Sequence, residues 1–263
     1  MKLDEKEQLL IERLRELKSF GVAYSGGTDS SLVLKVARDN EIVSFCACMA
    51  VAPVFFPHEL ERGKEFCRKC RISLIETRFD FFGSASIVKN DSRRCYYCKK
   101  KLFGEIKKLV QDNGYTYLVD GTNASDLSDF RAGIDAADEL GVVSPLRECG
   151  IKKEDVRQLA KKYDIPFWNE PASACLASRI PQGDIITADK IETVLKGELF
   201  LKNEDLNGPR LRHHGKIARI EVREDDFELI SGKTKKEHIV KGLKDLGFKY
   251  VTLDIEGYRT GST

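Results

Sequence analysis

The sequence lacks the features that would point to a membrane or a nucleic acid. No apolar run approaches the roughly 20 residues that a membrane-spanning helix needs, and the charged N-terminal stretch MKLDEKEQLL is unlike a secretory signal. The formal net charge is only +2, so no overall field favours nucleic acid or an anionic membrane. There is no internal repeat or low-complexity tract. We therefore expect a cytoplasmic protein with neither a nucleic acid nor a membrane as its partner.

What is present is the composition of a globular protein with a sizeable core. Of the 263 residues, 41% are hydrophobic and 33% are charged. Because the cytoplasm keeps thiols reduced, the eight cysteines are not expected to form a disulfide framework. Cys46 and Cys48 share one face of an expected strand, and Cys67 and Cys70 end an expected helix, so we predict that these four are core residues. We assign no role to Cys149.

Hydrophobic spacing predicts alternating helices and strands in the first part of the chain. Helical patterns cover residues 3–18, 57–70, 95–112 and 152–163 and the segment from Thr28, and strand-like runs cover 20–24, 42–50, 72–77 and 116–119. This alternation predicts an α/β fold, a doubly wound sheet of parallel strands. Ligands of such sheets bind at the carboxyl ends of the strands.

The alternation of strands and helices ends after Pro181. A helix is expected at 187–201 and another at 234–246, with strands at 210–214, 216–222 and 248–254. These elements predict a smaller C-terminal α+β domain. We place the boundary near residue 184, which gives domains 1–183 and 184–263.

A glycine-rich turn, VAYSGGTDSS, joins the first expected strand to a helix. Gly26 and Gly27 allow backbone N–H groups to point into one concavity, and the positive end of the helix adds to its attraction for an anion. Hydroxyls are supplied by Ser25, Thr28, Ser30 and Ser31, and Asp29 can position a magnesium ion or a ligand hydroxyl. The turn lacks the lysine of a Walker P-loop. A plain serine-capped turn, with Asp29 as a helix cap, is the structural alternative.

Ser25-Gly-Gly-Thr-Asp-Ser30 resembles the S-G-G-x-D-S motif of PP-loop ATP pyrophosphatases. The resemblance implies that the loop binds the β- and γ-phosphates while ATP, with Mg²⁺, transfers AMP to a carboxylate or amide oxygen. Oxygen is a poor leaving group, whereas the AMP of an acyl-adenylate is a good one, so a nitrogen or sulfur nucleophile can then attack.

Motifs along nearly the whole chain resemble the LarE family. They are Asp120-Gly-Thr-Asn-Ala-Ser-Asp126, Ser144-Pro-Leu-Arg-Glu148, Lys153-Glu-Asp-Val-Arg157, Trp168 to Pro181, Ala218-Arg-Ile-Glu-Val222 and Leu253 to Ser262. LarE enzymes convert the two carboxylates of pyridinium-3,5-biscarboxylic acid mononucleotide into thiocarboxylates, a step in making the nickel-pincer nucleotide of lactate racemase. The resemblance also implies a homo-oligomer, such as a hexamer, and a sulfide source as partner.

Three cysteines are candidates for supplying or holding the transferred sulfur. Cys95 and Cys98 lie three apart at a helix start, which favours a metal centre or a redox pair, and Cys175 lies in a loop. In one type of LarE, a cysteine at the Cys175 position gives up its own sulfur and becomes dehydroalanine. In the other type, three cysteines matching Cys95, Cys98 and Cys175 hold a 4Fe–4S cluster whose remaining iron carries a sulfide. We favour the cluster type.

The remaining candidate residues are polar or charged. We expect Asp120, Thr122, Asn123 and Asp126, which follow a strand, to face the nucleotide, and Lys153 and Arg179 to neutralise phosphate charge. Arg210 and Arg212 alternate on a strand and match the family's substrate-phosphate arginines. Glu198 and Glu221 resemble acidic residues linked to metal binding in the family, but alone they read as surface carboxylates.

Three other functions compete with this one. A PP-loop tRNA thiolase also carries three cysteines, but the near-neutral charge argues against it. An ammonia-using amide synthetase would leave the cysteines without a role. A non-catalytic nucleotide-binding protein would use them for structural zinc.

Overall fold

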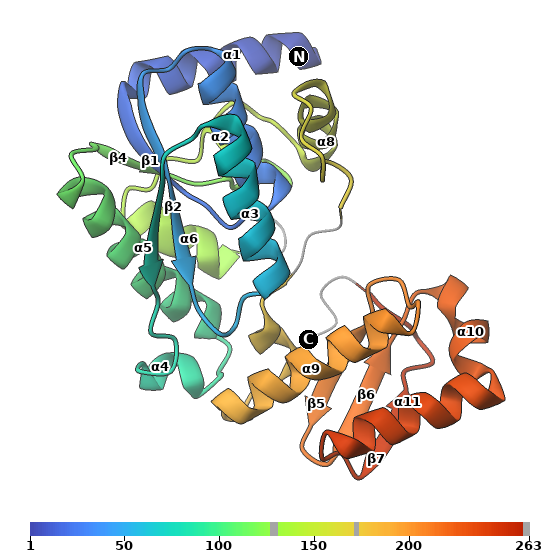
Figure 1. Ribbon diagram of the computed structural model, residues 1–263. Coiled ribbons are helices and arrows are strands. Elements are labelled where there is room, and N and C mark those ends of the chain that lie inside the picture. The colour runs from blue at the N-terminus through green and yellow to red at the C-terminus, as the bar shows by residue number, and fades with distance from the viewer. Residues whose placement is uncertain (127–130, 171–173, 260–263) are drawn as a thin grey trace. The chain divides into compact units, whose positions relative to one another are not determined.

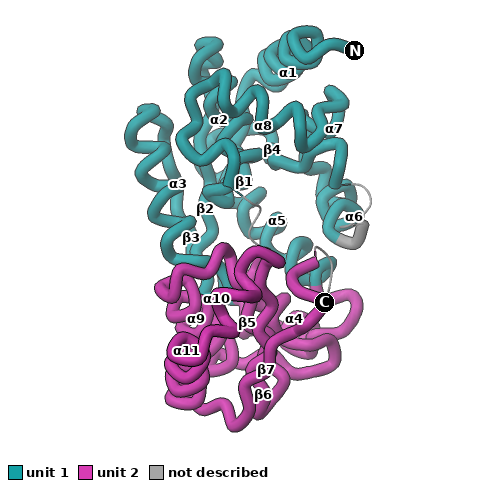
Figure 2. The backbone as a smooth tube through the Cα atoms, turned by 90° about the vertical axis from the view of Figure 1, so that its right-hand side faces the viewer, with its two compact units in different colours: residues 1–80, 95–173 teal, residues 81–94, 174–263 magenta. Residues whose placement is uncertain are grey.

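The computed structural model of the protein describes residues 1–126, 131–170 and 174–259. Two compact units make up the chain (Figure 2): residues 1–80 and 95–173 form unit 1, and residues 81–94 and 174–263 form unit 2. Unit 2 therefore starts at Ala174 rather than near residue 184, and it takes in a segment from the first half of the chain. The division into a nucleotide domain and a substrate or oligomerisation domain stays a prediction.

The sheet of unit 1 is parallel throughout, as predicted (Figure 1). Its strands are β1 (Ser19–Ala23), β2 (Ser44–Val51), β3 (Leu74–Arg78) and β4 (Tyr117–Val119). They lie in the order β3-β2-β1-β4, and a bridge from Val119 to Val143 extends the sheet beyond β4. The chain moves from β1 to β2 and β3 on one side and then returns to β4 on the other. The strand order therefore reverses between β1 and β4, where doubly wound sheets bind their ligands.

Helices flank this sheet and account for most of the rest of unit 1. They are α1 (Leu3–Leu17), α2 (Thr28–Asp39), α3 (Pro57–Cys70), α5 (Arg94–Asp112), α6 (Arg131–Glu139), α7 (Pro145–Glu148) and α8 (Lys153–Lys162). Pro57 stands in the first turn of α3, where its missing N–H costs nothing. The sequence did not predict α6, because its buried apolar residues include small alanines, Ala136 and Ala137, that give weak periodicity.

The core of unit 1 is built from the strands and the helix faces that cover them. Leu14 of α1, Phe20 of β1 and Leu32 of α2 belong to it and are fully or almost fully buried. Cys46 and Cys48 on β2 are also buried, with their sulfurs 3.6 Å apart, which confirms that they are core residues.

Unit 2 contains a three-stranded sheet in the order β5-β6-β7. Its elements are α4 (Ala85–Val88), η1 (Leu176–Arg179), α9 (Ala188–Asn203), β5 (Arg210–His214), β6 (Ile217–Glu221), η2 (Glu224–Asp226), α10 (Phe227–Ser231), α11 (Lys233–Asp245) and β7 (Tyr250–Leu253). Strands β5 and β6 are antiparallel, and β6 and β7 are parallel. Gly197 allows α9 to approach β5 closely, since a Cβ there would lie 2.1 Å from a methyl of Leu211.

The inserted segment 81–94 is anchored within unit 2 by one buried side chain. The amide of Asn90 donates to the carbonyls of Ile180, Pro181 and Asp184 at 3.2, 2.7 and 3.0 Å. Arg94 donates in turn to the Asn90 carboxamide oxygen at 2.7 Å and to the Ala177 carbonyl at 3.1 Å. These bonds explain why the segment belongs to unit 2.

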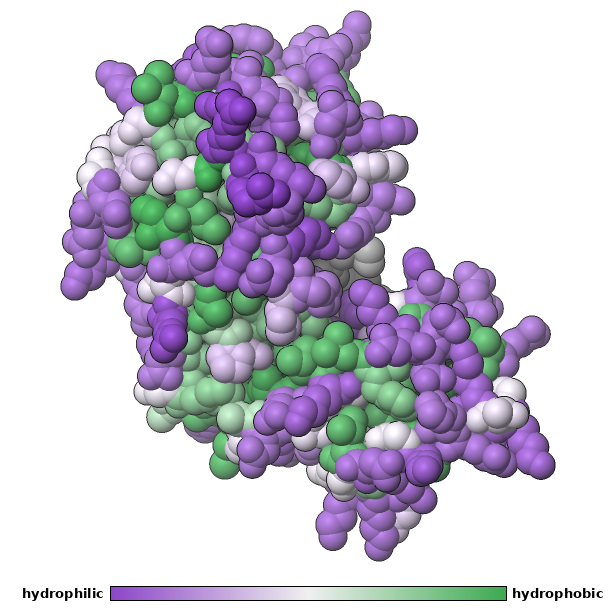
Figure 3. Space-filling view, viewed as in Figure 1, coloured by the Kyte–Doolittle hydropathy of each residue, from purple (hydrophilic) through white to green (hydrophobic). Residues whose placement is uncertain are grey.

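Hydrophilic residues cover most of the face drawn in Figure 3, as the share of charged residues leads one to expect. Within the described residues, no helix combines the length and the apolar character that crossing a membrane would require.

Candidate functional site

The glycine turn between β1 and α2 has a backbone that only glycine adopts easily. Gly26 has a φ of +77°, and a Cβ on it would lie 2.5 Å from the Glu59 carbonyl oxygen of α3. Gly63 of the same helix also lies close to the turn, because a Cβ there would be 3.0 Å from the Gly26 Cα. Helix α3 thus packs directly against the turn and fixes its shape.

The turn leads into the N-terminus of α2, which is open to an anion. The N-cap residue is Gly27, which has no side chain to cap the first turn. Its N–H meets the Ser25 hydroxyl at 3.3 Å, and the Ser25 and Ser30 hydroxyls lie 3.3 Å apart. Ser31 is fully buried, and its hydroxyl lies 3.1 Å from the Tyr24 hydroxyl, a contact that joins α2 to the residue after β1. Asp29 lies inside the helix and is not its cap.

The segment that follows β4 lines the same edge of the sheet. Gly121 approaches α2 so closely that a Cβ would lie 2.7 Å from the Ser30 nitrogen. Asp120 accepts hydrogen bonds from the Thr122 backbone, at 3.1 Å, and from the Thr122 hydroxyl. Asn123, 1% exposed, donates to Asp29 at 3.1 Å. The structure therefore brings the predicted residues from β4 beside the predicted residues of the turn.

Two charged groups complete this edge. Lys153 at the start of α8 forms an ion pair with Asp29, and the two side chains are 28% and 22% exposed. Asp126 accepts from the Asn123 N–H at 3.0 Å, and burial raises the pKa of its carboxyl. An incoming phosphate would compete with Asp29 for Lys153, and a magnesium ion would replace Lys153 on Asp29. The nucleotide-binding and metal-binding roles of these residues stay a prediction.

Arg62 of α3 is a residue of this region that the sequence analysis missed. Its guanidinium donates to the Gly26 carbonyl at 3.2 Å, forms an ion pair with Glu170 and lies 4.5 Å from the centre of the Phe167 ring. Its position on an expected amphipathic helix gave no signal, because only the folded chain brings α3 against the turn.

The cysteines fall into two groups by their burial. Cys46, Cys48, Cys67 and Cys149 are buried, whereas Cys70, Cys95, Cys98 and Cys175 are partly exposed. Burial raises the pKa of Cys67 to about 12 and that of Cys149 to about 11, which keeps both as inert thiols. Cys67 is thus confirmed as a core residue, and Cys70 is partly buried and packs against the same core.

Cys95 and Cys98 are the second and fifth residues of α5 and, three residues apart, lie on the same side of the helix. A helix N-terminus stabilises thiolates, which suits metal ligands. Cys175 immediately precedes η1 in the other unit. Within the described part of each unit, no group of three His, Cys, Asp or Glu side chains is arranged to hold a metal ion. The three-cysteine ligand set stays a prediction.

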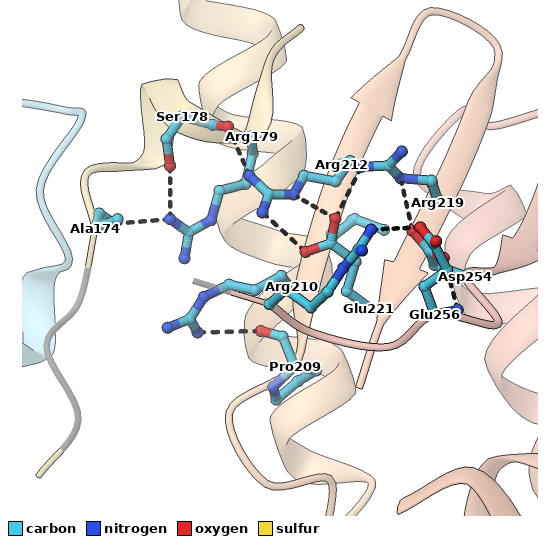
Figure 4. A network of polar contacts seen from close by, with 12 residues as sticks. Ala174, Ser178, Arg179, Pro209, Arg210, Arg212, Arg219, Glu221, Asp254 and Glu256 are labelled. Carbon is cyan, nitrogen blue, oxygen red and sulfur yellow. Dashed lines mark hydrogen bonds and ion pairs between the residues drawn. The ribbon is translucent and has the colours of Figure 1, made fainter. Parts of the chain in front are cut away.

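The predicted arginines of unit 2 belong to a buried network (Figure 4). Arg179, 1% exposed, pairs with Glu198 and donates to the Ala174 carbonyl at 2.8 Å. Arg212 pairs with Glu221 at 2.8 Å and donates to the Ser178 carbonyl at 2.8 Å. The reading of Glu198 and Glu221 as surface carboxylates is wrong. They are 5% and 0% exposed. Their burial is tolerated because each carboxylate is paired with a buried guanidinium.

Arg210 differs from these two arginines. It donates to the carbonyls of Gly208 and Pro209 at 3.2 and 3.3 Å and lies over the Tyr258 ring, 5.1 Å from its centre. In the described part of the chain, no carboxylate lies within ion-pair distance of it. Burial, reinforced by the charge of Arg179, lowers its pKa from the usual value. Of the two arginines expected to bind a substrate phosphate, Arg212 has a carboxylate partner, whereas Arg210 has none within the described residues.

Comparison with known proteins identifies relatives over nearly the whole chain. No protein-family model matches it. The chain is 37% identical to an uncharacterized protein of Synechocystis over 98% of its own length and 97% of the relative's. An uncharacterized protein of Methanocaldococcus jannaschii is 32% identical over 92% of both chains. Pyridinium-3,5-bisthiocarboxylic acid mononucleotide synthase of Lactiplantibacillus plantarum is 33% identical over 97% of this chain and 92% of that enzyme. With this identity over almost its full length, the chain belongs to the LarE family of pyridinium-3,5-bisthiocarboxylic acid mononucleotide synthases.

Proposed function

We propose that the protein is an ATP-dependent sulfur transferase that converts the carboxylates of pyridinium-3,5-biscarboxylic acid mononucleotide into thiocarboxylates. The observation that carries this proposal is the glycine turn, with an open helix N-terminus and an Asp29–Lys153 pair beside it. The named activity of the Lactiplantibacillus relative supports the choice of substrate.

The proposed reaction has two steps, and the described residues would act mainly in the first. A substrate carboxylate oxygen attacks the α-phosphorus of ATP, the bond to the β-phosphate oxygen breaks, and pyrophosphate leaves. The N–H groups of the first turn of α2 would bind the β- and γ-phosphates, and Lys153 would offset their charge. Asp29 would position the magnesium ion. In the second step a hydrosulfide adds to the acyl carbon, loses its proton, and AMP departs with the carbon–oxygen bond pair.

The sulfur would come from a 4Fe–4S cluster held by Cys95, Cys98 and Cys175. Such a cluster, with one iron lacking a protein ligand, supplies a site for an exchangeable sulfide. One observation fits it: Cys95 and Cys98 lie three residues apart on the same side of the N-terminal end of α5. The source of sulfide, the homo-oligomeric state and the cytoplasmic location remain part of the proposal.

Iron and acid-labile sulfide content, with electron paramagnetic resonance of the reduced sample, tests this on protein purified without oxygen. Variants Cys95→Ala, Cys98→Ala and Cys175→Ala should each lose the cluster. Cys70→Ala is the matched control, because Cys70 is also partly exposed and also belongs to a C-x-x-C pair. It should keep the iron of the wild type.

Absence of iron from the wild type after reconstitution would contradict the cluster mechanism. Cys175 would then be the sacrificial donor, and mass spectrometry after turnover would show the loss of hydrogen sulfide that forms dehydroalanine. Stoichiometric zinc in place of iron would instead support a non-catalytic protein. Activity that requires added RNA would support a tRNA thiolase.

A further inference from the structure

We infer that Arg62 is a positioning residue of the phosphate loop, which it ties to the Phe167–Glu170 segment so that the Gly26–Gly27 peptide stays turned for phosphate binding. This rests on the proposed binding of ATP by that loop. Arg62 lies on α3 and is far from the loop in sequence, so no motif includes it.

The first step of the argument is the orientation of one peptide group. The Gly26 carbonyl accepts a hydrogen bond from Arg62 at 3.2 Å. In a planar trans peptide the carbonyl and the next N–H point in opposite directions. Arg62 therefore keeps the Gly27 N–H on the side of the Ser25 hydroxyl, which it meets at 3.3 Å. Without Arg62, the flexible glycine pair could turn this carbonyl toward the phosphates and repel them.

The second step is the link from the loop to a distant part of unit 1. Arg62 also forms an ion pair with Glu170 and stacks on Phe167, with 4.5 Å between the guanidinium carbon and the ring centre. Thr28 donates independently to the Phe167 carbonyl at 3.1 Å. Phe66, one turn along α3, packs edge-on against Phe167 at 5.6 Å. The loop is thus joined to residues 167–170, from which the chain continues toward Cys175.

The contacts of Arg62 are poorly suited to a purely stabilising role. The ion pair with Glu170 joins side chains that are 24% and 53% exposed, and such pairs add little to stability. The Arg62 Nε is buried without a partner among the described residues, which costs free energy. The side chain is held in place by the Gly26 carbonyl, Glu170 and the Phe167 ring. Together these contacts join the phosphate loop to residues 167–170.

The test compares the binding of ATP and AMP, both with Mg²⁺, to the full chain by titration calorimetry. Arg62→Met should weaken ATP binding about tenfold and leave AMP binding unchanged, because AMP lacks the β- and γ-phosphates. Glu170→Gln should weaken ATP binding by a smaller factor. Arg62→Lys should restore it only partly, since one ammonium group cannot bridge both partners. Arg68→Met, which breaks an exposed ion pair with Glu65 on the same helix, is the matched control and should bind ATP normally.

Three results would overturn the inference. One is wild-type ATP affinity in a folded Arg62→Met variant. Another is equal loss of ATP and AMP binding, which would mean that Arg62 only supports the fold. The third is full rescue by Arg62→Lys, which would make Arg62 a direct phosphate ligand. If the wild type itself binds no ATP, the proposed function fails first, so the two failures are distinguishable.

Discussion

The polar edge of the sheet in unit 1 and the arginine network in unit 2 both contain ion pairs, but the pairs differ in their exposure to solvent. In unit 1, Asp29 and Lys153 are each more than a fifth exposed, and water or a ligand can replace either partner. In unit 2, Arg212 and Glu221 are 7% and 0% exposed. A pair that is open to solvent can exchange for phosphate and metal, whereas a buried pair must stay closed because each charge needs the other. Arg210 is the exception within unit 2.

Breaking the buried pair should have the largest effect on stability. In Glu221→Gln, the Arg212 guanidinium loses a carboxylate that it binds through both oxygens. Arg219 loses a single contact to the same carboxylate at 2.8 Å. Removing one partner of a buried ion pair costs about 3–5 kcal/mol. We expect faster hydrogen exchange of the β5 and β6 amides, since these strands carry the two partners.

The control for this experiment is Glu192→Gln on α9, which breaks an exposed pair with Lys196 in the same unit. It should leave exchange in β5 and β6 unchanged. Equal exchange rates in the Glu221 and Glu192 variants would mean that the buried pair contributes no more than a surface pair.

A second change sharpens the difference between the two arginines of β5. Arg210→Met removes a buried charge that has no carboxylate partner among the described residues, so the fold should be little affected. If Arg210 binds the substrate phosphate, KM for the mononucleotide should rise about tenfold while kcat changes less. Arg212→Met leaves Glu221 with Arg219 as its only cation among the described residues, and it should mainly reduce stability.

Steady-state kinetics and thermal unfolding of both variants separate the two roles. A larger rise in KM for Arg212→Met than for Arg210→Met would contradict the assignment. It would show that the Glu221 pair opens when the substrate binds.

The sequence predicted the strand, the glycine turn and the helix of residues 19–39 well, because the residues that determine them are close together along the chain. The strand, the Gly26 turn and the helix follow one another along the chain. The predicted range of α3, residues 57–70, is also the range that the structure has. Hydrophobic spacing also predicted the strands of both sheets to within a few residues. The residues after β4 were placed at the same edge because parallel strands share a carboxyl end.

The sequence could not predict contacts between residues that are distant along the chain. Glu198 on α9 and Glu221 on β6 look like surface carboxylates until the fold buries them against Arg179 and Arg212. Arg62 gives no sign of its contact with Gly26 for the same reason. The place of residues 81–94 in unit 2 was not predicted either, since it depends on hydrogen bonds between distant residues, such as those of Asn90 and Arg94.

The smallest expected effect concerns two neighbouring histidines on β5. Burial lowers the pKa of both His213 and His214, and the nearby charges of Lys190 and Arg219 respectively add to this shift. At pH 8 both rings are neutral in the folded and unfolded states, so neither affects stability. As the pH falls below the usual value of about 6.5, the unfolded chain takes up protons that the folded chain does not, and stability decreases.

The variant His213→Phe should reduce this acid loss, because it removes one of the two titrating rings and keeps the packing against Phe248. Urea unfolding at pH 8 and at pH 5.5 measures the difference for the wild type and the variant. The acid-induced loss should be smaller in the variant by less than about 1 kcal/mol, an effect well below that of Glu221→Gln. An unchanged loss would place the acid sensitivity outside His213, with His214 beside Arg219 as the other partly buried histidine of this strand.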